Sequence, residues 1–398
     1  MDVKSRKRNP QSEGILAENS ELGADGVAAL PIRLDRYGRA HQRALHMSDY
    51  VRSAGEIKLA NNLNQCGHWL VFRHYYTVDK LRLHAADFCK KHLLCPLCAV
   101  RRAAKYLKAY MDKLEFVLAE TPNLKAYMVT VTVVDGPSLP ERFKHLRKAM
   151  KSMTLARRHY LNSPDKRPHV EFAKALGGVH SIEAKRGSGS GLWHPHAHMV
   201  WLCHEEPDQA KLSQEWKEWT GDSFIVDVRP FHDQQDVVSG FIEVFKYALK
   251  FSELSFEDNW EAFKQLSGKR LVDSFGLLRG VQVSDDLTDE PLEDLPYIEL
   301  FYQWFNRSGY SLMKTKTVSE ISEQESSDNF IKSVKSKKTS LSRPNHLKIS
   351  ADGLYSLLTL LEEKNSSAFD PTSFYEPSTP AELRSCLARK LGKSFELD

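Results

Sequence analysis

Residues 193–202 read Trp-His-Pro-His-Ala-His-Met-Val-Trp-Leu, in which three histidines alternate strictly before an apolar stretch. A period of two is typical of a β-strand, so we expect His194, His196 and His198 on one face, together with Val200 and Leu202. Neighbouring histidines on that face would be roughly 6.6 Å apart, at about 3.3 Å of rise per residue. Two imidazoles at this spacing can converge on one cation, so the stretch predicts a metal site on a strand.

A second strand-like segment, residues 181–185, precedes the histidines and contains Glu183. The connection between the two segments reads Arg-Gly-Ser-Gly-Ser-Gly and suits a hairpin. If the loop is centred near Gly189, Glu183 falls opposite His196 in an antiparallel pair. We therefore expect a carboxylate to join the imidazoles on one ion.

The cysteines point to a second metal. Cys66 is followed by Cys89, Cys95 and Cys98, with His92 among them. In a reducing compartment, a Cys-x2-Cys pair with further Cys and His close by is better explained by Zn²⁺ than by disulfides. Cys95 and Cys98 form the firm pair and Cys89 joins them, whereas the fourth ligand is either Cys66 or His92. The sequence predicts one structural zinc per chain.

The distribution of charge is more informative than its sum. The chain has 56 basic and 52 acidic residues, a net charge of +4, whereas Lys and Arg gather in residues 80–113 and 142–158. Both segments read as parts of basic helices, over residues 98–118 and 139–160, and residues 285–294 are acidic. Two basic segments favour a polyanionic partner. The residues expected to contact such a partner are Arg101, Arg102, Arg147 and Lys148.

Residues 237–251 are expected to be helical and contain Glu243, Tyr247 and Lys250. Spacings of four and three residues place these side chains on one helical face. A free phenol has a pKa near 10, so only roughly one in a thousand is ionised at neutral pH. Lys250 would favour the phenolate, Glu243 is placed to act on a proton, and a nearby metal would polarise a phosphate.

Several of these motifs resemble those of one family. His196-Ala197-His198 resembles the His-hydrophobe-His motif of the HUH endonucleases, and residues 193–202 resemble motif 2 of plasmid rolling-circle replication initiators. Residues 123–134 resemble motif 1, and Glu-x3-Tyr-x2-Lys at 243–250 resembles motif 3. The family also carries a similar Cys-x5-Cys-Pro-x-Cys. The resemblance covers roughly residues 60–280.

The resemblance implies a site-specific, metal-dependent DNA nickase that also rejoins strands. In the family the second and third histidines bind a divalent metal, the tyrosine becomes joined to a 5′ phosphate, and the glutamate activates water to end a round of replication. These roles fall here on His196, His198, Tyr247 and Glu243, with His194 as an accessory group. The implied cofactors are Mg²⁺ or Mn²⁺ and structural Zn²⁺. The implied partners are plasmid origin DNA, as a single strand or hairpin, and the host helicase and polymerase.

The order of elements predicts the α+β class, with an antiparallel sheet flanked by helices. The resemblance implies that this sheet is an HUH endonuclease-like palm, accompanied by a small zinc-binding module. We expect a disordered arm over 1–45, the zinc-binding module over 50–105, the endonuclease core over 106–282 and a partly disordered C-terminal region over 283–398. In the last region we expect a linker over 315–348 and short helices at 354–361 and 380–391. Neither a signal peptide nor an apolar run of about 18 residues is found, which predicts a cytoplasmic protein without a membrane partner.

Three other functions stay open on the sequence. Two histidines and Glu183 could form the facial triad of a non-haem iron oxygenase. The chain could also be a non-catalytic, zinc-stabilised DNA-binding regulator with incidental histidines. Metal-dependent strand cleavage separates both from a nickase. Transposases and relaxases share the HUH chemistry, and an origin-dependent plasmid test distinguishes them from an initiator.

Overall fold

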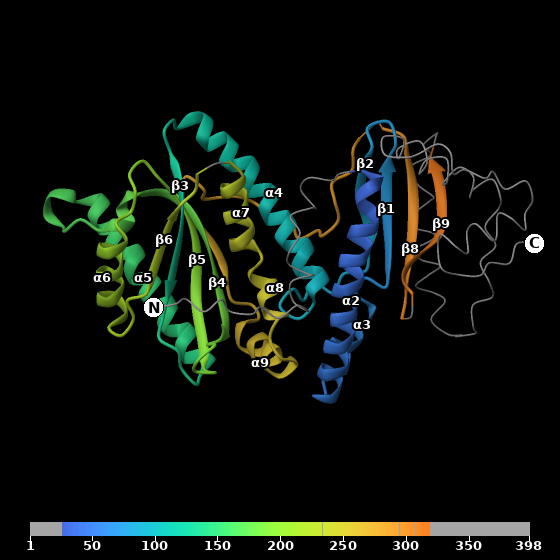
Figure 1. The fold of residues 1–398 in the computed structure, drawn as a ribbon, viewed down its shortest axis with the longest axis horizontal. Helices are drawn as coiled ribbons and strands as arrows, with labels where there is room; N and C mark the ends of the chain where they lie inside the picture. Colours follow the sequence, from blue (N-terminus) through green and yellow to red (C-terminus); the bar gives the residue numbers. More distant parts are fainter. Residues whose placement is uncertain (1–25, 233, 294, 307, 319–398) are drawn as a thin grey trace, which may run out of the picture. The chain divides into compact units, whose positions relative to one another are not determined.

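A five-stranded antiparallel sheet carries the histidine stretch (Figure 1). The structure is a computed structural model that describes residues 26–232, 234–293, 295–306 and 308–318. All of them lie in the first of the two units of the chain, Met1–Ser319. The sheet has the order β6 (Val226–Pro230), β3 (Lys125–Thr132), β5 (Trp193–Cys203), β4 (Ala175–Arg186), β7 (Val272–Gly276). The histidine strand β5 is therefore central.

Helices flank both faces of this sheet, which confirms the α+β class with antiparallel sheets and flanking helices. Contacts join α5 to β5 and to α6, and α7 to β4 and β5. The helices are α4 (Pro96–Glu120), α5 (Leu139–Asn162), α6 (Gln209–Thr220), α7 (Gln234–Phe245), α8 (Tyr247–Phe251) and α9 (Phe256–Leu266).

The alternation along β5 sends its side chains into two different apolar clusters. Ala197, Met199 and Trp201 are buried in the larger cluster, which includes the apolar residues of α5. Val200 and Leu202 are buried in a second cluster with residues of α4 and α7. Because the histidines share the parity of Val200, they lie on the face of the sheet that α7 partly covers.

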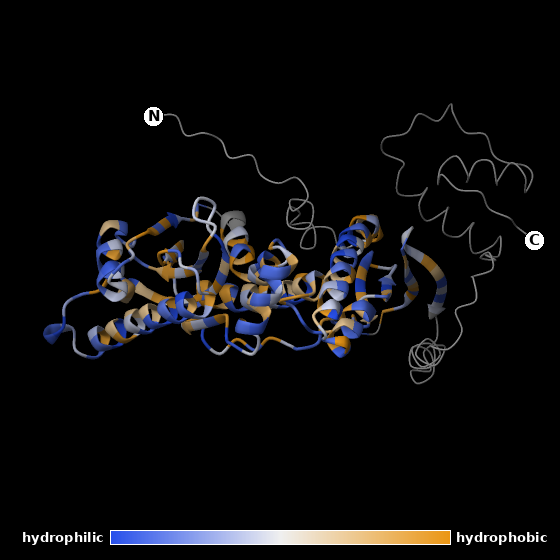
Figure 2. Cartoon of the chain, turned by 90° about the horizontal axis from the view of Figure 1, so that it is seen from below, coloured by the Kyte–Doolittle hydropathy of each residue, from blue (hydrophilic) through white to orange (hydrophobic). Residues whose placement is uncertain are grey.

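Helix α5 is amphipathic and begins at a cap. The Ser138 hydroxyl accepts a hydrogen bond from the Glu141 backbone at 3.4 Å, and Pro140 lies in the first turn. Leu139, Phe143 and Leu146 begin a buried stripe at helical spacing. Figure 2 shows both polar and apolar positions on the helices. Most lysines and arginines of α5 lie on its solvent-facing side.

A second antiparallel sheet has the order β2 (Lys80–Ala86), β1 (Trp69–Tyr75), β8 (Tyr297–Phe305), β9 (Gly309–Val318). The pairing of β1 with β8 brings together residues more than 200 positions apart in the sequence. Within the expected C-terminal region 283–398, residues 297–305 and 309–318 are strands rather than disorder or short helices.

The predicted disordered arm over residues 1–45 is wrong for residues 27–45. These residues form a short 3-10 helix and most of α2 (Leu30–Ser53), which is followed by α3 (Ile57–Gln65). The ring of Tyr37 lies 6.5 Å from that of Phe72, and His41 lies 4.8 Å from Trp304. Buried apolar residues recur at 37, 40, 44, 47 and 51, a helical period that the intervening Arg and Asp residues obscure in the sequence.

Residues 1–25 and 319–398 lie outside the described residues, and with them lie the predicted helices at 354–361 and 380–391 and most of the predicted linker. Of that linker, residues 315–318 belong to β9. None of the described helices combines the length and the apolar composition that crossing a membrane requires.

Candidate functional site

One carboxylate and two imidazoles converge on the α7-facing side of the five-stranded sheet. Glu183 in β4 pairs directly with His196 in β5, as the hairpin interpretation predicted. The Oε2 atom of Glu183 lies 3.3 Å from Nε2 of His196 and 3.7 Å from Nε2 of His198. The candidate ligand atoms all lie within 4.8 Å of one another. We call these three residues the metal cluster, because their donor set can hold one cation.

Hydrogen bonds aim both imidazoles at the same point. The Nδ1 atom of His198 lies 3.1 Å from the Thr130 hydroxyl, and Nδ1 of His196 lies 3.3 Å from the His194 carbonyl. Each contact occupies one ring nitrogen and turns the other toward Glu183. Orientation of this kind fixes the ring and its tautomer in metal sites.

Glu183 is a buried carboxylate that the described residues only partly satisfy. It is 2% exposed, and its Oε1 atom has no hydrogen-bond partner in the described part of the chain. Burial would raise the pKa of Glu183, but the contact with His196 and the charge of His198 lower it below the usual value. Burial also lowers the pKa of His198, which favours the neutral imidazole that metals bind. A buried anion with an unused oxygen suits a cation.

His194 does not join the metal cluster. Its Nδ1 atom instead contacts the carboxylate of Asp135, in the segment between β3 and α5, and its ring lies 5.4 Å from that of His196. The Ser190 hydroxyl donates to the second oxygen of the same carboxylate. The accessory role expected for His194 therefore lies beside the metal cluster, in a pair with Asp135.

Glu243 and Lys250 border the metal cluster. An oxygen of Glu243 in α7 lies 3.9 Å from Nε2 of His198, and the other oxygen pairs with Lys246. The positive charge of Lys250 in α8 lowers the pKa of both Glu183 and His198. A second carboxylate and a cation thus lie beside the metal cluster, on two separate helices.

Tyr247 departs from its predicted position. The helix expected over 237–251 is interrupted at Lys246, whose ψ of 5° separates α7 from α8. The Tyr247 ring is 4% exposed and lies edge-on to His92 at 6.2 Å. Burial raises the pKa of its phenol, which the charge of Arg102 only partly offsets. No hydrogen bond or ring contact among the described residues joins Tyr247 to the metal cluster, to Glu243 or to Lys250.

The four cysteines form a compact group. The Sγ atom of Cys66 lies 3.4 Å from that of Cys95 and 3.5 Å from that of Cys98, and Cys89 lies 3.6 Å from Cys98. The fourth candidate ligand is thus Cys66, because the imidazole of His92 lies against Tyr247 instead. Four thiols within 4.8 Å of one another are compatible with one bound metal ion.

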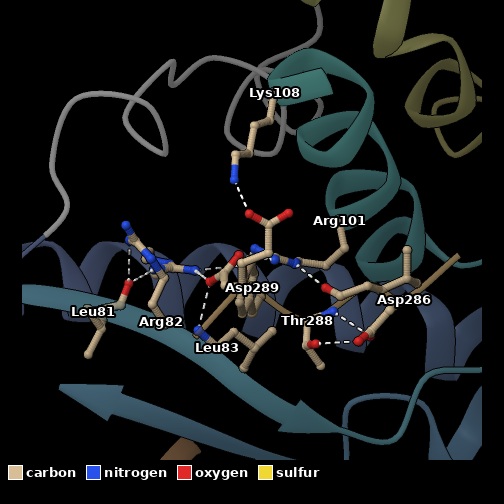
Figure 3. A network of polar contacts seen from close by, with 12 residues as sticks. Leu81, Arg82, Leu83, Arg101, Lys108, Asp286, Thr288 and Asp289 are labelled. Atoms are coloured by element: carbon tan, nitrogen blue, oxygen red, sulfur yellow. Dashed lines mark hydrogen bonds and ion pairs between the residues drawn. The ribbon is translucent and has the colours of Figure 1, made fainter. Parts of the chain in front are cut away.

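Two of the four residues expected to contact DNA make hydrogen bonds and ion pairs with other residues of the protein. Arg101 is 2% exposed and donates to the Leu287 carbonyl at 2.8 Å, to the Tyr37 hydroxyl at 3.0 Å and to Asp289. Figure 3 shows Asp289 between Arg101 and the backbone of Leu83. The predicted DNA contact of Arg101 is therefore wrong, because the side chain is a buried structural group.

Arg102 is held in a similar way by the acidic segment. Its guanidinium donates to the Ser284 carbonyl and to Asp285, both at 2.9 Å, and lies over the Tyr106 ring. Farther along α4, Lys108 pairs with Glu290 (Figure 3). The basic face of α4 thus contacts the acidic residues 285–290, a pairing that complementary charges alone could have suggested.

The other two predicted contacts, Arg147 and Lys148, lie on an exposed basic stripe of α5. None of its members has an ion pair with any residue of the described part of the chain, although Arg147 lies over the Phe143 ring. The exposed members of the stripe are Lys144, Arg147, Lys148, Lys151 and Arg158. Because α5 covers the face opposite the histidines, this stripe and the metal cluster are on different sides of the sheet.

Comparison with known proteins identifies relatives. A family model described as a replication protein matches residues 80–300. The chain is 24% identical over 270 residues to "Protein rep" of Streptococcus pneumoniae serotype 2, which covers 64% of this chain and 81% of that protein. It is also 24% identical to "Protein rep" of Bacillus amyloliquefaciens over 280 residues, 61% of this chain and 77% of that one. No solved structure matches the chain. The matched range contains the metal cluster, Glu243 and Tyr247.

Proposed function

We propose, from the premise that this chain belongs to the replication protein family of plasmid replication initiators, that it is a metal-dependent DNA nickase and strand-rejoining enzyme that starts rolling-circle replication. The observation that carries the proposal is the metal cluster of Glu183, His196 and His198 with Glu243 beside it. We assign the nickase to residues 106–282, as an HUH-like palm, and a metal-stabilised module to residues 50–105.

The donor set of the metal cluster fits a divalent cation. Two neutral imidazoles and one buried carboxylate with an unused oxygen would hold Mg²⁺ or Mn²⁺, although imidazoles accept other metals too. The cation would supply Lewis-acid polarisation of the scissile phosphate. The chain itself supplies the orientation, through the contacts of Thr130 and the His194 carbonyl with the two rings.

In the proposed reaction, the Tyr247 oxygen attacks the phosphorus of one phosphodiester. The phenolic proton passes to a base, for which Glu243 is placed, and the bond from phosphorus to the 3′ oxygen breaks. The 3′ oxygen takes up a proton and becomes the hydroxyl that primes synthesis, while Tyr247 stays joined to the 5′ phosphate. Lys250 would favour the phenolate. In a later step Glu243 would activate the water that ends a round.

This reaction requires Tyr247 to leave its buried position. A phenol with a raised pKa that packs on His92 is neither ionised nor near a phosphate bound at the metal cluster. The interruption at Lys246 directly precedes the tyrosine, and α8 has only five residues. We propose that binding of the DNA strand repositions α8, so that Tyr247 turns toward the metal cluster only when substrate is present.

The remaining parts of the proposal concern binding. The exposed stripe on α5 would contact the phosphates of plasmid origin DNA, and the nick would fall in a single-stranded or hairpin segment. The host helicase and polymerase would act on the opened strand. The four cysteines would hold Zn²⁺, which prefers four thiolates in structural sites.

The test is a nicking assay on a 3′-labelled oligonucleotide from the origin of the plasmid that encodes the chain, with Mn²⁺. Wild-type protein should cut the strand and form a covalent protein–DNA adduct, and chelation should abolish both. Tyr247→Phe should bind the strand but neither cut it nor form the adduct, whereas Tyr76→Phe, at an exposed position, should behave as wild type. Full activity in Tyr247→Phe would eliminate the assignment of the nucleophile.

One observation favours a second candidate function. A buried phenol that contacts no member of the metal cluster is what a non-catalytic DNA-binding regulator would have. Such a protein would bind the origin without metal-dependent cleavage. Origin binding without any cut strand or adduct from the wild-type protein, at any Mg²⁺ or Mn²⁺ concentration, would support the regulator and exclude the nickase.

A further inference from the structure

A hollow of about 410 Å³ lies between α4 and the segment that follows β7, apart from the metal cluster. Hollows of this size in proteins commonly hold small molecules. Its charged lining consists of four cations and two carboxylates: Lys105, Lys108, Lys113, Arg279, Asp112 and Glu290. We call this hollow the α4 pocket. Because its walls carry more cations than carboxylates, an anionic ligand fits it better than a neutral or cationic one.

Apolar packing fixes the two walls of the α4 pocket against each other. Leu107, Tyr110 and Leu114 of α4 are buried in the second apolar cluster, and Leu278 from the opposite wall is buried in the same cluster. Val281 packs against that cluster and also lines the pocket. The two walls are therefore held together by the core, and the cations are carried by a fixed frame.

Three of the four cations have no ion pair with any residue of the described part of the chain. They are Lys105, Lys113 and Arg279. Lys113 lies over the Phe116 ring at 5.0 Å, and Lys108 pairs with Glu290 (Figure 3). The contact with Lys108 lowers the pKa of Glu290, and the charge of Lys105 adds to this effect. Glu290 is thus an ionised carboxylate where a ligand anion could bind instead.

The loop opposite α4 adds backbone donors. Residues 280–282 line the pocket, and their three backbone amides have no hydrogen-bond partner among the described residues. Gly280 has a φ of 83°, the left-handed conformation in which successive N–H groups can turn toward one anion. Unpaired amides beside several cations are suited to the oxygens of phosphate groups.

We propose that the α4 pocket binds the polyphosphate chain of a free nucleoside triphosphate. Adjacent phosphates of such a chain place several negative charges close together, as the cations are placed around the pocket. A DNA strand instead spreads its charges along its length, one per nucleotide. Ala109 and Val281 give the pocket an apolar wall that the nucleoside would contact. The inference goes beyond the nickase and does not depend on it.

The test is isothermal titration calorimetry of the full chain with dTTP, without added divalent metal, so that the metal cluster does not hold the phosphates. Wild type should bind one dTTP per chain. Arg279→Gln with Lys113→Gln should bind it roughly tenfold to a hundredfold more weakly, the effect of losing charge-assisted hydrogen bonds. Glu290→Gln should bind it roughly twofold to fivefold more tightly, because the competing carboxylate is removed.

The matched control is Lys211→Gln with Arg229→Gln, which also removes one lysine and one arginine. Their side chains are 69% and 73% exposed and lie outside the α4 pocket, so this variant should bind dTTP as wild type does. Unchanged thermal midpoints would show that all variants are folded. Equal weakening in the two double variants would overturn the inference, because the effect would then be one of net charge.

Two further ligands identify the source of the phosphates. Tripolyphosphate should compete with dTTP and should lose affinity in the same pocket variant. If dT20 displaced dTTP equally well at the same concentration of phosphate groups, the inference would be overturned and the pocket would belong to the DNA-binding surface. Absence of dTTP binding by wild type would overturn it too. None of these outcomes depends on nicking, so a protein that binds dTTP and never cuts DNA would keep the inference and reject the nickase.

Discussion

At the scale of single residues, the metal cluster depends on one buried carboxylate. Glu183 is nearly inaccessible and one of its oxygens has no partner among the described residues, which is costly unless a cation binds there. Glu183→Gln keeps the shape and removes the charge. We expect the wild-type thermal midpoint to rise on addition of Mn²⁺ and that of Glu183→Gln to stay unchanged, because only a bound ligand stabilises the folded state.

The control for this experiment is Glu115→Gln, which removes an exposed carboxylate from α4. Its midpoint should respond to Mn²⁺ as that of wild type does. Equal shifts in wild type and Glu183→Gln, measured by differential scanning fluorimetry, would show that the ion binds elsewhere.

His180 in β4 predicts how stability depends on pH. Burial lowers its pKa from 6.5 to about 4; Asp273 opposes this shift and Arg147 adds to it. The unfolded chain therefore binds more protons between pH 6.5 and 4, and stability falls as the pH is lowered through that window. We expect wild type to lose about 1–2 kcal/mol more than His180→Thr between pH 7 and pH 5 in urea unfolding. Parallel losses in the two proteins would contradict this.

At the scale of elements, sequence patterns predicted the strands and the pairings between residues that are close in the sequence. Alternation in residues 193–202 predicted β5 and its histidine face, and the glycine-rich connection predicted the pairing of Glu183 with His196. The pairing of β1 with β8 could not be predicted, because no local pattern specifies a partner more than 200 residues away. The interruption of the helix at Lys246 could not be predicted either. The helical spacing of Glu243 and Tyr247 does not reveal that the Tyr247 ring packs on His92.

Helix α5 carries the prediction that belongs to this scale. Its exposed stripe has no acidic partners in the described residues, unlike the basic face of α4, which contacts residues 285–290. Each phosphate contact contributes about −0.9 to the slope of log affinity against log salt for duplex DNA. Arg147→Gln with Lys148→Gln should therefore make the slope shallower by about two, measured by anisotropy over a series of NaCl concentrations.

The matched control for α5 is Lys211→Gln with Lys217→Gln, which removes two cations from α6. It should leave the slope unchanged if α5 alone contacts the duplex. An unchanged slope in the α5 variant would place the duplex elsewhere on the protein.

At the scale of the whole molecule, the cysteine group connects separate parts of the fold. Cys66 ends α3, Cys95 caps the beginning of α4, and α4 then contacts α2, α7 and α8. The residues next to Tyr247 come from the same region, since His92 lies between the cysteines and Arg102 follows Cys98 by one helical turn. A metal bound by the four thiols would thus stabilise both the second sheet and the buried position of Tyr247.

Removal of this metal should therefore act on the whole fold. We expect one zinc per chain by elemental analysis, and a thermal midpoint lowered by on the order of 10 °C after chelation, because the free energy of metal binding contributes to folding. Cys66→Ser should lose the zinc and show the lower midpoint without chelator. Cys203→Ser removes a buried thiol outside the group and should keep both the zinc and the wild-type response to chelation. A chain that retains its thermal midpoint without zinc would show that packing alone holds α3 to α4. The buried position of Tyr247 would then not depend on a bound metal.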